Sequence, residues 1–223
     1  MKYSASKENY IKAIFHLQQE LEQVSTNSLA EALETAPASV TDMLKKLKAQ
    51  QLLQYERYRG VRLTASGKKL AIQIIRKHRL WELFLVEKLQ FGWEEVHDIA
   101  EELEHISSSK LVDRLDEFLG FPKADPHGDP IPDMQGRIPA LRQSTVSEMP
   151  ESGFGRVSGI GDQSPAMLAL LRHNHIALGA HLQVRKRFEA DRSVEIKLAG
   201  HPAVNISEHV AKNIRVTYEN NPQ

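Results

Sequence analysis

The chain has 223 residues, of which 41% are hydrophobic and 26% are charged, with 29 Lys and Arg against 29 Asp and Glu. This length accommodates one to three small domains, and the composition is that of an ordinary soluble globular protein. Cysteine is absent, which excludes disulfides and thiolate metal sites. Neither an apolar run of transmembrane length nor a secretory signal is recognisable, so we expect a cytoplasmic protein.

The charge is unevenly distributed along the chain. Residues 1–70 have a net charge of +4, residues 71–120 a net charge of −5, and the remainder a net charge of +1. A basic segment joined to an acidic one is typical of a protein that binds both a polyanion and a cation. Because solvated helix faces differ by similar amounts, the charge pattern carries little weight by itself.

The N-terminal segment predicts three helices. Apolar positions over residues 6–21 recur at helical spacing. Ser25 or Thr26 offers an N-cap for a short second helix, and Pro37 suits the first turn of a third helix.

Two short β-like stretches follow, at residues 52–56 and 61–63. The order of helix, helix, turn, helix and hairpin is typical of a winged helix-turn-helix. We therefore expect a DNA-binding domain over residues 1–70.

The middle of the chain predicts a helical domain over residues 71–122. Thr64 can cap a long helix that runs to about Leu89. A break at Phe-Gly-Trp separates it from helices expected near residues 94–106 and 110–119.

Six of the ten prolines lie between Pro122 and Pro150, which indicates a linker, placed at residues 123–147. Beyond it, glycines punctuate short β-like runs. One helix and two strands are expected there, near residues 167–172, 182–188 and 194–198. This pattern predicts a small β-barrel over residues 148–220. The expected fold class is mainly α, with a β-hairpin wing and a small β-barrel.

Residue types that bind metals gather on two predicted helices. Four of them, at offsets 0, 4, 7 and 8, share one helical face: His97, Glu101, Glu104 and His105. On the long helix, His78 and Glu82 also share a face. Imidazole with carboxylate and no thiolate suits manganese, ferrous iron or zinc, and a cation offsets the repulsion between the carboxylates. The competing interpretation is a solvated acidic helix with incidental histidines.

Five stretches, taken in chain order, carry a family resemblance: ENYIKAIFHL, PASVTDMLKKL, YERYRGVRLT, RKHRLWELFL and VHDIAEELEH. They resemble the diphtheria-toxin-repressor and manganese-transport-regulator family of metal-dependent repressors, and FPKADPHGDPIPD is similar to the family consensus after the third dimerisation helix. The resemblance covers residues 1 to about 135. The C-terminal region resembles the SH3-like (FeoA-type) module of the longer members.

The resemblance implies two metal sites. The primary site would use Asn9, Glu101, Glu104 and His105. The ancillary site would use His78, Glu82 and His97, with help from the C-terminal module, where Asp162 and Gln163 are candidates.

Three positions bear on which metal is bound. Iron-preferring members have a cysteine where this chain has Glu101, whereas manganese-type members have a carboxylate at Asn9 and a glutamate at Lys12. The oxygen-rich set favours Mn²⁺, with Fe²⁺ as the alternative and with Zn²⁺ or Co²⁺ able to bind in vitro.

The recognition helix of a winged helix-turn-helix places its N-terminal part in the major groove. Small polar side chains there can contact base edges, and lysines can contact phosphates. The arginines of the hairpin can contact the DNA backbone or the minor groove. The residues expected at DNA are Thr26, Ala38, Ser39, Thr41, Asp42, Lys45, Lys46, Arg57 and Arg59. For a single lysine or arginine, solvent exposure is the simpler interpretation; as a set on one motif, they indicate DNA contact.

These features predict a homodimeric, metal-dependent repressor of metal-uptake genes that binds a pseudo-palindromic operator of double-stranded DNA when it is metal-loaded. The alternative is a winged-helix regulator that responds to a non-metal ligand. A dimetal carboxylate enzyme is disfavoured, because both Glu-x-x-His copies lie on one helix rather than on two. The sequence also has no HExxH, P-loop or GxSxG motif, so we do not expect an enzyme. Since it has no apolar run of transmembrane length, we do not expect a membrane protein either.

Overall fold

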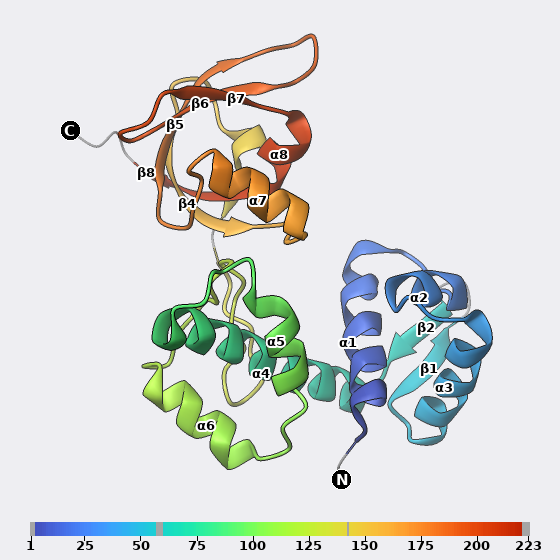
Figure 1. The fold of residues 1–223 in the computed structure, drawn as a ribbon. Helices are drawn as coiled ribbons and strands as arrows, with labels where there is room; N and C mark the ends of the chain where they lie inside the picture. The colour runs from blue at the N-terminus through green and yellow to red at the C-terminus, as the bar shows by residue number, and fades with distance from the viewer. Residues whose placement is uncertain (1–2, 57–59, 142, 220–223) are drawn as a thin grey trace. The chain divides into compact units, whose positions relative to one another are not determined.

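The computed structural model describes residues 3–56, 60–141 and 143–219, and the chain forms two compact units (Figure 1). The first unit comprises Met1–Trp81, Asp98–Phe121 and Ile131–Ile138. The second unit comprises Glu82–His97, Pro122–Pro130 and Pro139–Gln223.

The first unit begins with three helices: α1 (Ala5–Glu20), α2 (Thr26–Ala32) and α3 (Pro37–Ala49). The hydroxyl of Ser25 accepts the backbone N–H of Ser28 at 3.0 Å, which caps α2 as expected. A proline at the first position starts α3 without loss of a helical hydrogen bond.

A hairpin of β1 (Leu53–Glu56) and β2 (Gly60–Leu63) follows α3, with Leu53 opposite Leu63. One face of each element is apolar and buried, and these faces form a common core that includes Ile11, Ile14, Leu29, Leu44 and Leu47. The N-terminal part is therefore a winged helix-turn-helix, as its sequence predicts.

Three further helices follow: α4 (Ala65–Leu89), α5 (Val96–Leu103) and α6 (Ser109–Phe118). Inside the first unit, Arg76 of α4 forms ion pairs with Asp116 at 2.7 Å and with Asp113 at 3.2 Å. Arg76 and Asp116 are both buried, so this pairing ties α6 to α4.

Helix α5 is shorter than the predicted 94–106. A turn from Gly92 to Glu95 precedes it, and Glu104 and His105 form a turn after its last residue. The backbone N–H of Glu104 still bonds to the carbonyl of Ala100 at 2.8 Å, so the helical direction continues for these two residues.

The second unit contains a six-stranded antiparallel sheet with the strand order β3-β8-β4-β5-β6-β7. Its elements are β3 (Ser144–Thr145), η1 (Val146–Glu148), β4 (Phe154–Ile160), α7 (Pro165–His173), β5 (His181–Arg187), β6 (Val194–Leu198), β7 (Ala203–Ile206), α8 (Glu208–Asn213) and β8 (Ile214–Glu219). The strands curl around an apolar core, with α7 and α8 beside the sheet (Figure 1).

The predicted C-terminal helix lies within α7, and the two predicted strands correspond to β5 and β6. The sequence did not predict β7, α8 or β8. The expected class, mainly helical with a hairpin wing and a small SH3-like β domain, is confirmed. Among the described residues, no helix combines the length and the apolar character that crossing a bilayer requires.

Candidate metal centre

Three buried side chains of the second unit meet at one point: Glu82 from α4, and Asp125 and His127 from the proline-rich segment. Their relative exposures are 1%, 4% and 1%. One ligand atom from each residue lies within 4.8 Å of the others. Two buried carboxylates and an imidazole at this spacing form a donor set suited to a divalent transition metal.

A local turn presents the two loop residues. The Oδ1 atom of Asp125 accepts the backbone N–H groups of His127 at 2.8 Å and of Asp129 at 3.0 Å. This is the hydrogen-bonded turn that aspartate forms with the backbone that follows it. Asp125 therefore both shapes the loop and supplies one of the two loop side chains of a type that can bind a metal ion.

The ring of His127 is oriented by Trp93. Its Nε2 atom lies 2.9 Å from the carbonyl oxygen of Trp93, and the two rings are stacked with centroids 5.8 Å apart. Its Nδ1 atom lies 3.7 Å from Oε2 of Glu82. A hydrogen bond from one imidazole nitrogen to a carbonyl fixes the other nitrogen as the ligand atom.

The electrostatics of this centre favour a cation. Burial lowers the pKa of His127, but the hydrogen bond and charge of Glu82 and the charge of Asp125 outweigh it, so the pKa is raised above its ordinary value. A site that attracts a proton to its imidazole has a negative potential, which also attracts a metal ion.

Hydrogen bonds from the β domain hold the loop that carries Asp125 and His127. Asp129 accepts hydrogen bonds from Arg215 Nη2 at 2.6 Å and from Gln163 Nε2 at 2.8 Å. The backbone N–H of Ile160 donates to the carbonyl of His127 at 2.8 Å. Gln163, a candidate ligand from the sequence, therefore contacts the loop beside the centre.

The other C-terminal candidate, Asp162, accepts the backbone N–H of Ser164 at 2.9 Å. One of its carboxylate oxygens lies 3.6 Å from Nε2 of His209. These hydrogen bonds, first to Ser164 and then to His209, lower the pKa of Asp162.

Of the predicted ancillary ligands, Glu82 and His97 are neighbours in the second unit, with Oε1 and Nδ1 3.4 Å apart. The side chain of His97 is half-exposed. His78 lies one helical turn before Glu82 on α4. Its Nδ1 atom is 2.7 Å from Oε2 of the buried Glu104.

Three of the four predicted primary ligands, Glu101, Glu104 and His105, belong to a second cluster, between α1 and α5 in the first unit. The Nζ atom of Lys12 lies 3.0 Å from Glu101 and 2.8 Å from each carboxylate oxygen of Glu104. Burial raises the pKa of Glu104, but the hydrogen bond from His78 and the charge of Lys12 together lower it below its ordinary value.

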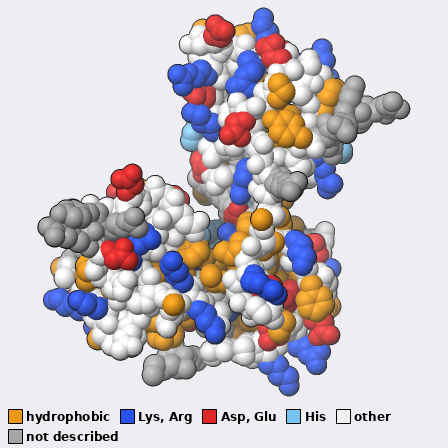
Figure 2. Space-filling view, turned by 180° about the vertical axis from the view of Figure 1, so that it is seen from behind, with side chains coloured by type: hydrophobic (Ala, Val, Ile, Leu, Met, Phe, Trp, Pro, Cys, Tyr) orange, Lys and Arg blue, Asp and Glu red, His pale blue; other side chains and the backbone are white. Residues whose placement is uncertain are grey.

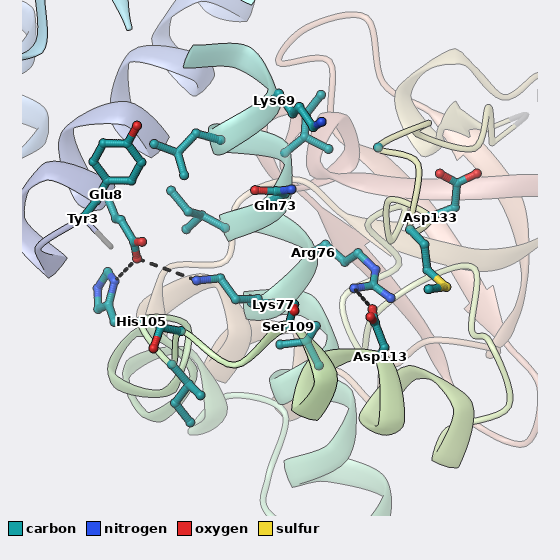
Figure 3. Close-up of a pocket in the computed structure, with 18 of the residues that line it drawn as sticks. Tyr3, Glu8, Lys69, Gln73, Arg76, Lys77, His105, Ser109, Asp113 and Asp133 are labelled. Atoms are coloured by element: carbon teal, nitrogen blue, oxygen red, sulfur yellow. Dashed lines mark hydrogen bonds and ion pairs between the residues drawn. The ribbon is translucent and has the colours of Figure 1, made fainter. Parts of the chain in front are cut away.

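Glu8 belongs to the same cluster and was missed by the sequence analysis. Its Oε2 atom lies 2.7 Å from Nδ1 of His105 and 3.7 Å from Nζ of Lys77. Dashed lines in Figure 3 mark both interactions. These residues line a pocket of about 400 Å³ in the first unit. Glu8 and Lys12 are four residues apart on α1, and this spacing was the available signal.

Asn9 lies elsewhere on α1. It lines a hollow with residues of α1, α3 and the α2–α3 connection, among them Thr35, Ser39 and Asp42. Glu8, rather than Asn9, is the residue of α1 that contacts His105. The sequence analysis also did not single out Asp125 and His127 as candidate ligands, although the stretch ADPHGDP carries a signal. Its three ligand-type side chains, Asp125, His127 and Asp129, lie beside turn-forming proline and glycine.

Helix α3 carries six of the nine residues predicted at DNA, and four of these six lie in its N-terminal half. Ala38, Ser39, Thr41, Asp42, Lys45 and Lys46 are exposed, and Thr26 at the start of α2 is half-buried. The hydroxyl of Thr41 donates to the carbonyl of Pro37 at 3.0 Å, so its hydrogen is used within α3 while the oxygen can still accept. Arg57 and Arg59 lie outside the described residues.

On the face drawn in Figure 2, Lys and Arg side chains are dispersed among acidic and hydrophobic ones. Basic residues alone therefore do not mark a DNA-binding face there. The expectation of DNA contact therefore depends on the exposed, small polar side chains of α3.

Three family profiles match consecutive parts of the chain. The iron dependent repressor N-terminal DNA binding domain matches residues 2–61. The iron dependent repressor metal binding and dimerisation domain matches residues 64–133, and the FeoA domain matches residues 144–218.

Individual relatives agree with these profiles. The HTH-type transcriptional regulator MntR of Oceanobacillus iheyensis is 38% identical over 120 residues, which cover 54% of this chain and 81% of that protein. The diphtheria toxin repressor of Corynebacterium jeikeium is 27% identical over 186 residues, which cover 80% of this chain and 78% of that protein. A solved manganese-dependent transcriptional repressor in complex with manganese matches with a TM-score of 0.84 and 34% identity, covering 96% of this chain and 100% of that one.

The resemblance read from the sequence motifs is thus confirmed, as is the expectation of a regulator rather than an enzyme. The chain belongs to the iron dependent repressor family and is a metal-responsive, DNA-binding transcriptional repressor.

Proposed function

We propose that the chain represses metal-uptake genes in response to Mn²⁺, which it binds through Glu82, Asp125 and His127. The observation that carries this proposal is the convergence of these three buried side chains, with ligand atoms within 4.8 Å of one another. Glu82 and Asp125 bring two buried carboxylates close together, and each charge loses hydration on burial. A bound divalent ion would neutralise that charge and join α4 to the loop.

The donor chemistry supports manganese. Two carboxylates and one imidazole, in a chain without cysteine, make a hard, oxygen-rich set. Fe²⁺ is the alternative, and Zn²⁺ or Co²⁺ would bind in vitro by the general order of divalent affinities. His97 and His78 are proposed as further ligands. His97 contacts Glu82, with Nδ1 and Oε1 3.4 Å apart, and His78 precedes Glu82 by one turn of α4.

The chain divides into four segments with separate proposed roles. We propose a DNA-binding domain over residues 1–70, a helical metal-binding and dimerisation domain over 71–122, a connecting segment over 123–147 and an SH3-like domain over 148–220. The connecting segment contributes more than length, because it supplies Asp125 and His127 to the centre.

The repressor would act as a homodimer on a pseudo-palindromic operator. A two-fold dimer presents two copies of α3 to half-sites about one helical turn apart. Apolar side chains exposed on α6 and just after it suit such an interface: Leu111, Phe118 and Phe121. A protein that binds chromosomal operators would work in the cytoplasm.

The test is DNA binding, measured by fluorescence anisotropy on an uptake-gene operator, with Mn²⁺, anaerobic Fe²⁺, Co²⁺, Zn²⁺ or excess chelator. We expect tight binding with Mn²⁺, its loss in chelator, and its loss in His127→Ala. A matched control is His173→Ala, which removes an exposed histidine of α7. Equal binding with metal and with chelator would favour the regulator of a non-metal ligand.

A further inference from the structure

The cluster between α1 and α5 already contains a cation. Lys12 places its ammonium group 2.8 Å from both oxygens of Glu104 and 3.0 Å from Glu101. The lysine side chain is only 15% exposed and Glu104 is fully buried. This is a desolvated ion pair, in which screening by solvent is weak.

Two carboxylates of the cluster are also paired with histidines. Nδ1 of His105 is bonded to Glu8, and Nδ1 of His78 is bonded to Glu104, both at 2.7 Å. The neutral Asn9 lines a different hollow, so it adds no carboxylate to this cluster. A divalent ion bound by Glu101 and Glu104 would have to displace the ammonium group or lie directly beside it, and like charges repel strongly at such a distance. The residues of this cluster therefore do not fit a metal ion.

We propose that Lys12 is the permanent cation of this cluster and links α1 to α5 in place of a metal ion. The regulatory metal ion then binds only at the centre formed by Glu82, Asp125 and His127. The inference rests on the proposed function in that it assigns all metal dependence to that centre. Lys12 with Glu101 and Glu104, and Glu8 with His105, connect α1 to α5 and the turn after it by direct ion pairs. Chelators remove none of these contacts.

The experiment counts bound Mn²⁺ per chain, by electron paramagnetic resonance of the free ion during titration of the full-length protein. The variants are Lys12→Met, which removes the charge and keeps a side chain of similar length, and Lys12→Arg, which keeps the charge. Two further variants remove a carboxylate: Lys12→Met with Glu101→Gln removes it from the opened cluster, and Glu101→Gln alone removes it while Lys12 stays in place. Thermal melting of each variant identifies any that fail to fold, and the Lys12→Arg titration then still tests the inference.

We expect Lys12→Met to bind one Mn²⁺ more than the wild type, the double variant to lose that extra ion, and Lys12→Arg to match the wild type. A folded Lys12→Met that gains no ion would overturn the inference, as would a wild-type site lost in Glu101→Gln or an extra ion bound by Lys12→Arg. The His127→Ala variant keeps the two ideas apart. If it binds as much Mn²⁺ as the wild type, the proposed Glu82 centre is wrong, whereas the comparison at Lys12 still decides whether lysine excludes metal from the other cluster.

Discussion

The Nε2 atom of His127 lies 2.9 Å from the carbonyl oxygen of Trp93, and the two rings stack with their planes 29° apart. Trp93 also packs against the core of the β domain. A residue packed against the hydrophobic core of the second unit therefore sets the orientation of an imidazole in the candidate metal centre.

The first prediction concerns Trp93. Trp93→Ala removes the ring that holds the His127 imidazole but no metal ligand, so Mn²⁺ affinity is expected to fall roughly 10–100-fold, as for other residues that orient a ligand. Trp93→Phe keeps a stacking ring and should retain most of the affinity. Phe91→Ala, at a partly exposed neighbouring position, is the control. Unchanged Mn²⁺ binding in Trp93→Ala would show that the ring needs no such support.

The second prediction concerns Gly128, in the loop of the same centre. It has a φ of +80°, and a Cβ atom there would lie 2.0 Å from the carbonyl oxygen of Ser158. Gly128→Ala is therefore expected to push the loop away from β4 and to abolish tight Mn²⁺ binding. Gly120 has a similar φ of +76° but no atom within 4 Å of the added Cβ.

The comparison of these two glycines separates backbone strain from steric exclusion. Gly120→Ala carries only the cost of the left-handed conformation, about 1–2 kcal/mol, and should bind Mn²⁺ normally. The measurements are thermal melting and Mn²⁺ titration of both variants. Equal effects of the two substitutions would mean that the contact between the loop and β4 is unimportant.

The sequence predicted most helices because their signals are local. Pro37 at a first turn and a capping serine at position 25 mark helix starts without reference to the rest of the fold. The β domain was predicted less completely, because β8 pairs with β4, more than 50 residues earlier in the chain. Pairing at such a separation leaves no local periodicity to detect.

The site shows the same division between local and long-range information. Helical spacing placed His97, Glu101, Glu104 and His105 on one face, yet His97 contacts Glu82 while Glu101 and Glu104 contact Lys12. Spacing along a helix tells which side chains can meet but not which partners other elements bring to them. The assignment of Asn9, Glu101, Glu104 and His105 to a metal site stays a prediction, and the position of Lys12 is the physical argument against it.

The third prediction concerns the proposed dimer. Phe121 is 55% exposed, directly after α6, with a φ of +56°. Aspartate tolerates this conformation better than most residues, so Phe121→Asp should leave the subunit folded while placing a charge in the interface. Sedimentation velocity is expected to show monomers, with weakened operator binding. Leu170→Asp, at an exposed apolar position of α7, is the control, and a dimer that survives Phe121→Asp would place the interface elsewhere.

The fourth prediction distinguishes the two kinds of contact that α3 is proposed to make with DNA. Lys45 is exposed and forms only a loose pair with Asp42, at 3.7 Å, so its ammonium group is available to a phosphate. Each phosphate contact contributes about 0.9 to the slope of log affinity against log salt concentration. Lys45→Ala should therefore reduce that slope by the contribution of about one contact and weaken binding similarly for all sequences.

Ser39→Ala should instead leave the slope unchanged and relax the preference for one base pair, since an uncharged hydroxyl releases no counterion. Lys110→Ala, at an exposed position of α6, is the control and should change neither the slope nor the base preference. If Lys45→Ala altered base preference while leaving the salt slope intact, α3 would lie in the groove in a different orientation, with Lys45 at the base edges.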